Sequence, residues 1–291
     1  MSKQIEAQIV VAGHLCLDVI PAFREQAGSL AAILAPGKLA EIGPALLSTG
    51  GAVSNTGLAL HRLGVPVKLM GKLGEDLFGR AIIDLLKRHD PALAEGMIVV
   101  PGEHSSYTIV ISPPNVDRLF LHCTGANDTF SAADVRPEEL KGAKLFHFGY
   151  PPLMRNMYAN GGAELETLLS TVKAHGLTVS LDMAWPDPDS PAGKADWRSI
   201  LAKALPHVDL FLPSLEEILF MLHPERYVKL AKDSGGEVLA AADGEMLSEL
   251  ADELLEMGAA IVVLKLGEHG LYVKTSSDAA RLSRMGACAP G

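Results

Sequence analysis

Residues Gln8 to Gly13 read QIVVAG, a short apolar run closed by a glycine. Such a run predicts a strand that is buried on both faces. Four similar runs follow, and helical periodicity separates each of them from the next. They are Lys144 to Gly149 (KLFHFG), Leu177 to Asp182 (LTVSLD), Val208 to Pro213 (VDLFLP) and Ala260 to Lys265 (AIVVLK). The alternation predicts an α/β fold, in which a doubly wound, mostly parallel sheet lies between two layers of helices.

Two stretches have the apolar spacing of surface helices that pack on such a sheet. The first runs from Asp76 to His89, with Asp76 as its N-cap, and the second runs from about Gly244 to Met257. The second helix leads directly into the last predicted strand, as expected for a helix that connects parallel strands.

A β-rich segment interrupts the alternation between Met97 and Cys123. Its two runs, YTIVIS at 107–112 and RLFLHC at 118–123, are joined by Pro113 to Val116 without a crossover helix. That pattern is typical of a hairpin. We therefore expect residues 97–123 to form a small β-hairpin lid inserted into one domain that spans residues 1–291.

The length and composition of the chain fit one large globular domain, and they restrict which partners and cellular locations are expected. Of the 291 residues, 48% are hydrophobic and 21% are charged, and the formal net charge is -10. An acidic chain without a basic stripe is not expected to bind nucleic acid. Residues 1–7 resemble no targeting signal, and no run of 18 uncharged apolar residues predicts a membrane segment. Cys16, Cys123 and Cys288 are far apart, which favours a reducing, cytoplasmic location.

Candidate ligand-binding residues follow the first predicted strand. Gly50 and Gly51 open the run GGAVSNTGLAL, where paired glycines before a helix let backbone amides approach a ligand. Asn55 would then offer both a donor and an acceptor to a sugar hydroxyl. Asp18, in GHLCLD, lies where open α/β sheets bind ligands. For the glycine run, the alternative is a capped helix after a tight turn. For Asp18, the alternative is an aspartate that serves only a turn or an N-cap.

Two later turns could serve a metal ion and a nucleotide. In PSLEE, Ser214 is a natural N-cap and Glu217 stands at the capping-box position, although Glu217 could also hold Mg²⁺ through water molecules. In KLGEHG, Gly267 and Gly270 permit a turn against which a nucleotide can pack, and Lys265 could reach a phosphate or close a salt bridge. For PSLEE the alternative is simple helix capping, and for KLGEHG it is a strand-turn-strand connection.

The commonest enzyme fingerprints do not occur in the sequence. It contains no G-x-x-x-x-G-K-[ST] loop, no G-x-G-x-x-G after the first strand and no G-x-S-x-G elbow. The ten histidines form no close pair with metal-ligand spacing. Dinucleotide-dependent and serine-hydrolase activities are therefore disfavoured.

The order of the motifs along the chain resembles that of the ribokinase-like (PfkB) carbohydrate kinase family. The matching landmarks are GHLCLD, GGAVSN, GKLGEDLFG, the β-rich lid, VSLDMAWPD, FLPSLEE and VVLKLGEHG. This resemblance covers nearly the whole chain and implies a ribokinase-like fold. It also implies ATP-dependent, Mg²⁺-assisted phosphotransfer to a hydroxyl of a sugar or sugar-like alcohol, under a lid that excludes water.

The resemblance also implies roles for individual residues. The residues that would contact the sugar are Asp18, Gly50, Gly51 and Asn55. The residues that would border ATP are Lys265, Gly267 and Gly270. Asp182 would face the cleft and Glu217 would serve the Mg²⁺ site, where the family usually has asparagine in place of Ser214. The lid is also a surface through which two copies could form a homodimer.

One family signature has no counterpart in the sequence. The family has a Gly-Ala-Gly-Asp turn whose aspartate is the catalytic base, and nothing after Gly270 matches it. We therefore expect the domain to lack its C-terminal part, and the catalytic residue is unknown. Residues Gly125 to Asp128 (GAND) are similar, but they follow the lid hairpin, where the family has an ordinary loop. The alternative function is a non-catalytic sugar-binding relative or a fragment without the base.

Overall fold

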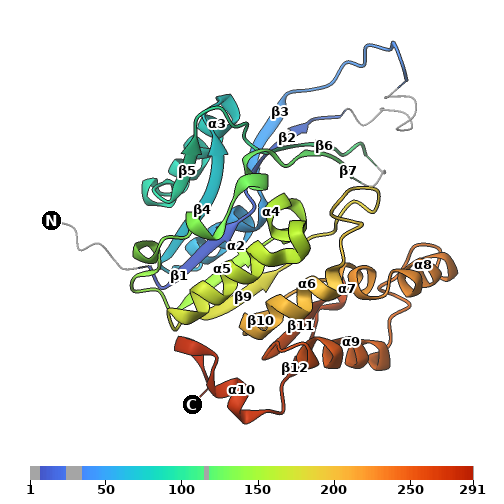
Figure 1. Cartoon of the computed structure of the whole chain (residues 1–291). Helices are drawn as coiled ribbons and strands as arrows, with labels where there is room; N and C mark the ends of the chain where they lie inside the picture. The colour runs from blue at the N-terminus through green and yellow to red at the C-terminus, as the bar shows by residue number, and fades with distance from the viewer. Residues whose placement is uncertain (1–6, 24–34, 115–117, 291) are drawn as a thin grey trace.

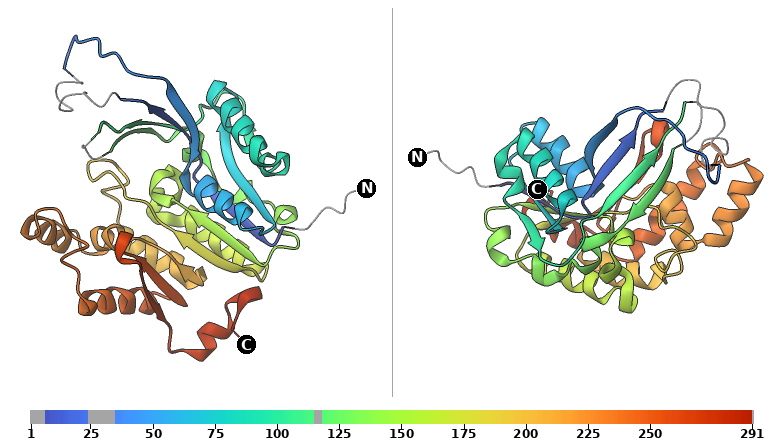
Figure 2. Two further views of the ribbon diagram at one scale, coloured as in Figure 1. Left: turned by 180° about the vertical axis from the view of Figure 1, so that it is seen from behind. Right: turned by 90° about the horizontal axis from the view of Figure 1, so that it is seen from above.

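The computed structural model describes residues 7–23, 35–114 and 118–290. Within these ranges the chain forms an eight-stranded sheet and a separate four-stranded sheet that projects beyond one end of it (Figures 1 and 2). Residues 1–6 and part of the predicted hairpin turn, Asn115 and Val116, lie outside the described residues. None of the helices in the described ranges is long and apolar enough to cross a membrane.

The larger sheet has the order β12-β11-β10-β9-β8-β1-β4-β5, and all neighbouring strands are parallel except β11 and β12. Its strands are β1 (Ile9–Gly13), β4 (Val67–Gly74), β5 (Met97–Val100), β8 (Leu145–Gly149), β9 (Thr178–Asp182), β10 (Leu210–Phe211), β11 (Ile261–Lys265) and β12 (Leu271–Thr275). The chain winds from β1 toward β4 on one side and from β8 outward on the other. The carboxyl ends of β1 and β8 are therefore the topological switch point, where such sheets bind ligands.

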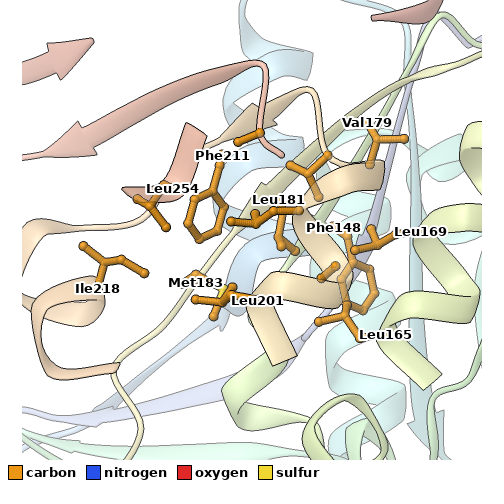
Figure 3. Close-up of a cluster of buried hydrophobic side chains, with 14 of the residues drawn as sticks. Phe148, Leu165, Leu169, Val179, Leu181, Met183, Leu201, Phe211, Ile218 and Leu254 are labelled. Atoms are coloured by element: carbon orange, nitrogen blue, oxygen red, sulfur yellow. The ribbon is translucent and has the colours of Figure 1, made fainter. Parts of the chain in front are cut away.

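Helices cover both faces of this sheet, which confirms the predicted three-layer fold. The longer ones are α2 (Gly51–Arg62), α3 (Leu77–His89), α5 (Ala163–Ala174), α6 (Trp197–Ala204), α7 (Leu215–Leu222), α8 (Pro224–Asp233) and α9 (Gly244–Glu256). On one face, side chains of α5, α6, α7 and α9 pack against Phe148, Leu181 and Phe211 (Figure 3). On the other face, α2 and α3 pack against Val11 and Leu69. Alternate residues of each strand point to opposite layers, so both layers have a buried apolar core.

The smaller sheet is the lid, and it contains more of the chain than the sequence predicted. Its order is β3-β2-β6-β7, formed by β2 (Cys16–Pro21), β3 (Ala45–Gly50), β6 (Tyr107–Ile111) and β7 (Leu119–Cys123). The antiparallel pair β6–β7 confirms the hairpin. The start of the lid at Met97 is wrong, because β5 pairs in parallel with β4 in the central sheet. Helix α3 acts as the crossover that makes this parallel pairing feasible.

Candidate active site

Two glycines place the start of α2 against the switch point. Gly51 has a φ of +87°, and a Cβ atom there would lie 2.5 Å from both Nδ1 and the carbonyl oxygen of His14. A Cβ atom on Gly50 would overlap the carboxylate of Asp18. Only glycine therefore lets these two side chains approach the backbone that opens the helix. As the N-cap, Gly50 also has no side chain to occupy the first-turn amides.

Asp18 lies in the lid, where the sequence did not place it. The chain leaves β1 at Gly13 and turns directly into β2, so Asp18 is a lid residue and not the end of a central strand. The Sγ atom of Cys16 lies 3.4 Å from Oδ1 of Asp18. Burial raises the pKa of Asp18, and hydrogen bonds from Cys16 and Thr108 oppose that rise. The carboxylate is half-buried beside Gly50, with polar neighbours on its own sheet.

Three aromatic side chains that the sequence interpretation missed complete this part of the site. Nε2 of His14 lies 3.2 Å from Nε2 of His122 in β7, and the ring of His14 lies 6.1 Å from that of Tyr150. Burial is the main cause that raises the pKa of Tyr150 to about 12, and the neighbouring exposed side chain of Asn55 opposes this rise. His14 and Tyr150 each directly follow a strand that ends in glycine. That position was the signal in the sequence that could have identified them.

Charged residues lie at the ends of the neighbouring strands. Asp182 ends β9 and forms an ion pair with Lys265, which ends β11. Burial is the main cause that raises the pKa of Asp182 to about 6. The charge of Lys265 opposes this rise and that of Glu217 adds to it. Of the two roles left open for Lys265, the structure shows the salt bridge.

Glu217 forms the predicted capping box with Ser214 at the start of α7. The Ser214 amide donates to Oε2 of Glu217 over 2.7 Å, and the Glu217 amide donates to the Ser214 hydroxyl over 3.2 Å. The electrostatic effect of Glu217 reaches both Asp182 and Tyr150. Capping therefore holds Glu217 close to the charged strand ends.

Gly267 and Gly270 are separate from these contacts. They bracket a short 3-10 helix (Gly267–His269) between β11 and β12, with φ values of +56° and +87°. Both are exposed, and a Cβ atom on Gly270 would meet nothing within 4 Å. The predicted strand-turn-strand connection is present, and its outer surface is open.

The GAND stretch is part of the scaffold, as expected for a loop. The fully buried side chain of Asn127 donates to the Leu15 carbonyl over 3.0 Å and accepts from the Leu15 amide over 3.2 Å. Asp128 accepts from the Arg155 amide over 2.9 Å and from the Thr124 hydroxyl over 2.7 Å. These bonds occupy both side chains in holding the lid hairpin to its surroundings.

The contacts join most of the candidate residues in one row along the carboxyl edge of the central sheet. The row leads from the charged pair Asp182–Lys265 through Tyr150 and Asn55 to the lid. Carboxylate, amide and hydroxyl groups that face the same edge suit a ligand with several hydroxyl groups. Among residues 7–23, 35–114 and 118–290, no group of three or more His, Cys, Asp or Glu side chains could hold a metal ion by itself.

Comparison with known proteins identifies relatives of the same kind. A family model described as "pfkB family carbohydrate kinase" matches residues 6–285. Fructokinase-2 of Oryza sativa is 26% identical over 252 residues, which cover 82% of this chain and 69% of the relative. The 2-dehydro-3-deoxygluconokinase of Bacillus subtilis is 25% identical over 265 residues, which cover 83% and 68%.

Solved structures show the same fold. The fructokinase of Xylella fastidiosa with bound ATP has a TM-score of 0.66 and 18% identity, covering 94% of this chain and 72% of that one. The ribokinase of Arabidopsis thaliana complexed with ribose and ATP has a TM-score of 0.64 and 18% identity, covering 94% and 76%. These similarities confirm the α/β fold with its lid.

Proposed function

Since the chain belongs to the pfkB family of carbohydrate kinases, we propose that it transfers the γ-phosphoryl group of ATP to a hydroxyl of a sugar or sugar-like alcohol. The observation that carries this proposal is the row of polar side chains that begins at Asp182 and Lys265 and ends at Asp18 in the lid. The row lies at the switch point of the sheet, where such folds bind ligands. The relatives named above act on sugars or sugar acids by their names, which supports the same substrate class.

We assign the sugar to the lid end of the row. Asp18 can accept from two hydroxyl groups, and Asn55 can donate and accept at once. Because Gly50 and Gly51 have no side chains, the sugar can approach the backbone at the start of the helix closely. Such a pocket positions the attacking hydroxyl, and positioning supplies much of the rate enhancement in phosphoryl transfer.

We assign ATP to the open turn that contains Gly267 and Gly270, with Lys265 at the phosphate end. Glu217 and Asp182 fit a magnesium ion that keeps much of its water shell, because Mg²⁺ is commonly held by one or two carboxylates together with substrate phosphates. When bound, Mg²⁺ would neutralise developing phosphate charge. The chain itself would orient both substrates and exclude water by means of the lid.

A second candidate function is sugar binding without turnover. It is favoured by one feature of the structure: in the stretch GAND, the Asp128 carboxylate is occupied by hydrogen bonds from Thr124 and Arg155. We assign no residue of this chain as the base that would take the proton of the attacking hydroxyl. Heat of sugar binding without production of ADP would select this second function.

The experiment is calorimetry with a panel that includes fructose and ribose, together with an assay for ADP release in the presence of ATP and Mg²⁺. Asn55→Ala and Asp18→Ala should each weaken sugar binding about tenfold or more, since each removes a hydrogen-bonding partner. Arg62→Ala is the matched control, because Arg62 is an exposed residue at the far end of the same helix. Unchanged sugar affinity in both Asn55→Ala and Asp18→Ala would contradict the assignment of the sugar pocket.

We also propose that two copies associate through the lid. Its strands carry four large apolar side chains with high exposure, namely Leu46 (64%), Leu47 (44%), Phe120 (56%) and Leu121 (51%). These side chains lie on β3 and β7, the two edge strands of the lid sheet, and exposed apolar groups of this size are typical of a surface that another protein covers. A second copy of the chain brings the same apolar strands and can cover them symmetrically.

A further inference from the structure

Two histidines, of which His14 is buried and His122 is exposed as a residue, connect the lid to the end of β1. His14 follows Gly13 and is 1% exposed, whereas His122 belongs to lid strand β7. Their Nε2 atoms lie 3.2 Å apart and their ring centroids 5.1 Å apart. A hydrogen bond between two Nε2 atoms requires that one carries the proton and the other offers a lone pair.

The contact between the histidines continues into the candidate sugar site. Nδ1 of His122 lies 3.0 Å from the hydroxyl of Thr108 in β6. That hydroxyl donates to Sγ of Cys16 over 3.6 Å, and the Cys16 thiol donates in turn to Oδ1 of Asp18 over 3.4 Å. Side chains from the β1–β2 connection and from lid strands β7, β6 and β2 thus form one chain of hydrogen bonds that ends at Asp18.

The direction of this chain follows from its two ends. An ionised carboxylate can only accept, so the Cys16 thiol donates to Asp18. Thr108 then donates its single proton to Sγ of Cys16 and accepts from Nδ1 of His122. His122 then offers a lone pair at Nε2 and accepts from Nε2 of His14. Nδ1 of His14 is left as a lone pair. The opposite direction would put a buried N–H there, and within the described residues this Nδ1 atom has no hydrogen-bond partner. Buried N–H groups without a partner are rare, so the first direction is preferred.

We propose that His14, His122 and Thr108 are positioning residues, whose directed hydrogen bonds orient the Asp18 carboxylate and hold the lid against the central sheet only while both histidines are neutral. A protonated histidine donates from both ring nitrogens and would break the chain at the contact between the two rings. The inference rests on the proposed sugar site at Asp18. It adds that protonation of His14 or His122 would release the lid from the central sheet.

The surroundings favour the neutral form of both rings in the closed state. Burial is the main cause that lowers the pKa of His14 to about 3, and the neighbouring His122 lowers it further. His122 is exposed as a residue, but partial desolvation of its ring also lowers its pKa, and the charge of Asp128 opposes this effect. The other titratable groups that face the pair are Cys16 and Asp18 from β2 and Tyr150 after β8.

The sign of the pH effect follows from these directions. Once the lid opens, the histidines regain a pKa of about 6.5, which is above that of the closed state. The closed lid is therefore favoured above about pH 6.5 and loses stability as the pH falls below that value. If sugar binding needs the closed lid, affinity should fall about tenfold between pH 7.5 and 5.5 for each proton taken up.

The first test needs no sugar. In the full chain labelled with ¹⁵N-histidine, long-range ¹H–¹⁵N spectra at pH 7.5 should show His122 protonated at Nδ1 and His14 protonated at Nε2. Spectra of His122→Asn and His14→Gln assign the signals. A His122 protonated at Nε2, or a charged ring in either residue, would overturn the proposal whether or not the protein binds sugar.

The second test measures sugar affinity between pH 7.5 and 5.5 in folded variants. The asparagine of His122→Asn can still donate to Thr108 but does not titrate, so the loss of affinity should be about tenfold smaller than in the unaltered protein, with only the share of His14 remaining. His175→Asn, which changes an exposed histidine after α5, should keep the full loss. Sugar binding with the same pH dependence in all three proteins would overturn the inference and leave the proposed function intact. Failure of every sugar to bind the unaltered protein would instead reject the sugar site.

Discussion

The carboxylate of Asp182 and the ammonium group of Lys265 form an ion pair across the end of β10, the strand that separates β9 from β11. Asp182 is only 8% exposed, and its pKa is raised to about 6 although Lys265 lies beside it. Desolvation of the carboxylate therefore outweighs the attraction of the pair. The charged strand end at the candidate site is maintained at a cost in stability.

The substitution Asp182→Asn should stabilise the protein in a pH-dependent way. The folded-state pKa of about 6 exceeds the ordinary value of 3.8. The carboxyl thus contributes most to stability below pH 3.8 and loses that contribution as the pH rises through 6. Urea unfolding at pH 8 should show a gain of about 2 kcal/mol for the variant, and at pH 4.5 the gain should be much smaller. Asp187→Asn, in an exposed loop, is the control, and an equal gain at both pH values would contradict the argument.

Gly51→Ala should destabilise the chain more than Gly64→Ala at the other end of α2. Both glycines have left-handed backbones, with φ values of +87° and +78°. A Cβ atom on Gly64 meets nothing within 4 Å, so that variant should lose about 1 kcal/mol from backbone strain alone. On Gly51 the same atom meets His14 at 2.5 Å, and the loss should reach about 3 kcal/mol. Thermal and urea unfolding measure both losses of stability. Equal losses would show that His14 moves away from the added Cβ atom at little energetic cost.

Arg281→Met should lower stability without changing sugar affinity. Arg281 donates to the fully buried Asp209 over 2.9 Å and to the Val208 carbonyl over 2.6 Å, beyond the amino end of β10 and away from the candidate site. Removal of one partner leaves a buried carboxylate with only Lys173 as its counter-charge. The free energy of unfolding should fall by about 3 kcal/mol. Arg284→Met, at an exposed position after the same short helix, should change it little.

Phe120→Asp should convert the proposed dimer to a monomer. The side chain of Phe120 is 56% exposed on lid strand β7, and a charge there cannot be buried at low cost in an apolar interface. Analytical ultracentrifugation should show a lower mass for the variant with unchanged unfolding. Leu271→Asp, which changes an equally exposed leucine on the distant strand β12, should leave the mass unchanged. A monomeric unaltered protein would refute association through the lid.

Features that depend on neighbours in the chain could be predicted from the sequence. Five of the eight central strands, namely β1, β8, β9, β10 and β11, follow from their apolar runs, although β10 is shorter than its run, with only Leu210–Phe211 in the sheet. The N-cap of α3 at Asp76 and the capping box of Ser214 and Glu217 are confirmed. Each uses a bond that spans only three residues, so spacing alone specifies it.

Other features required the folded chain. Asp18 was predicted to follow a central strand, whereas it lies in lid strand β2 beside Gly50, because nothing in GHLCLD signals that the chain leaves the central sheet after Gly13. The pairing partners of β2 are β3 and β6, the second of which is far away in the sequence. Strand pairing of that kind depends on long-range contacts that no local pattern encodes.

The sequence by itself therefore determined the α/β architecture, the caps and the glycine-rich helix start, since all of these arise from local periodicity and short-range hydrogen bonds. Only the tertiary structure decided which side chains meet. His14 and His122 are distant in the sequence, yet their rings touch, and Tyr150 after β8 lies beside Asn55 in α2. Such contacts depend on sheet order and register, because a side chain's partners across a sheet are set by the strands beside it.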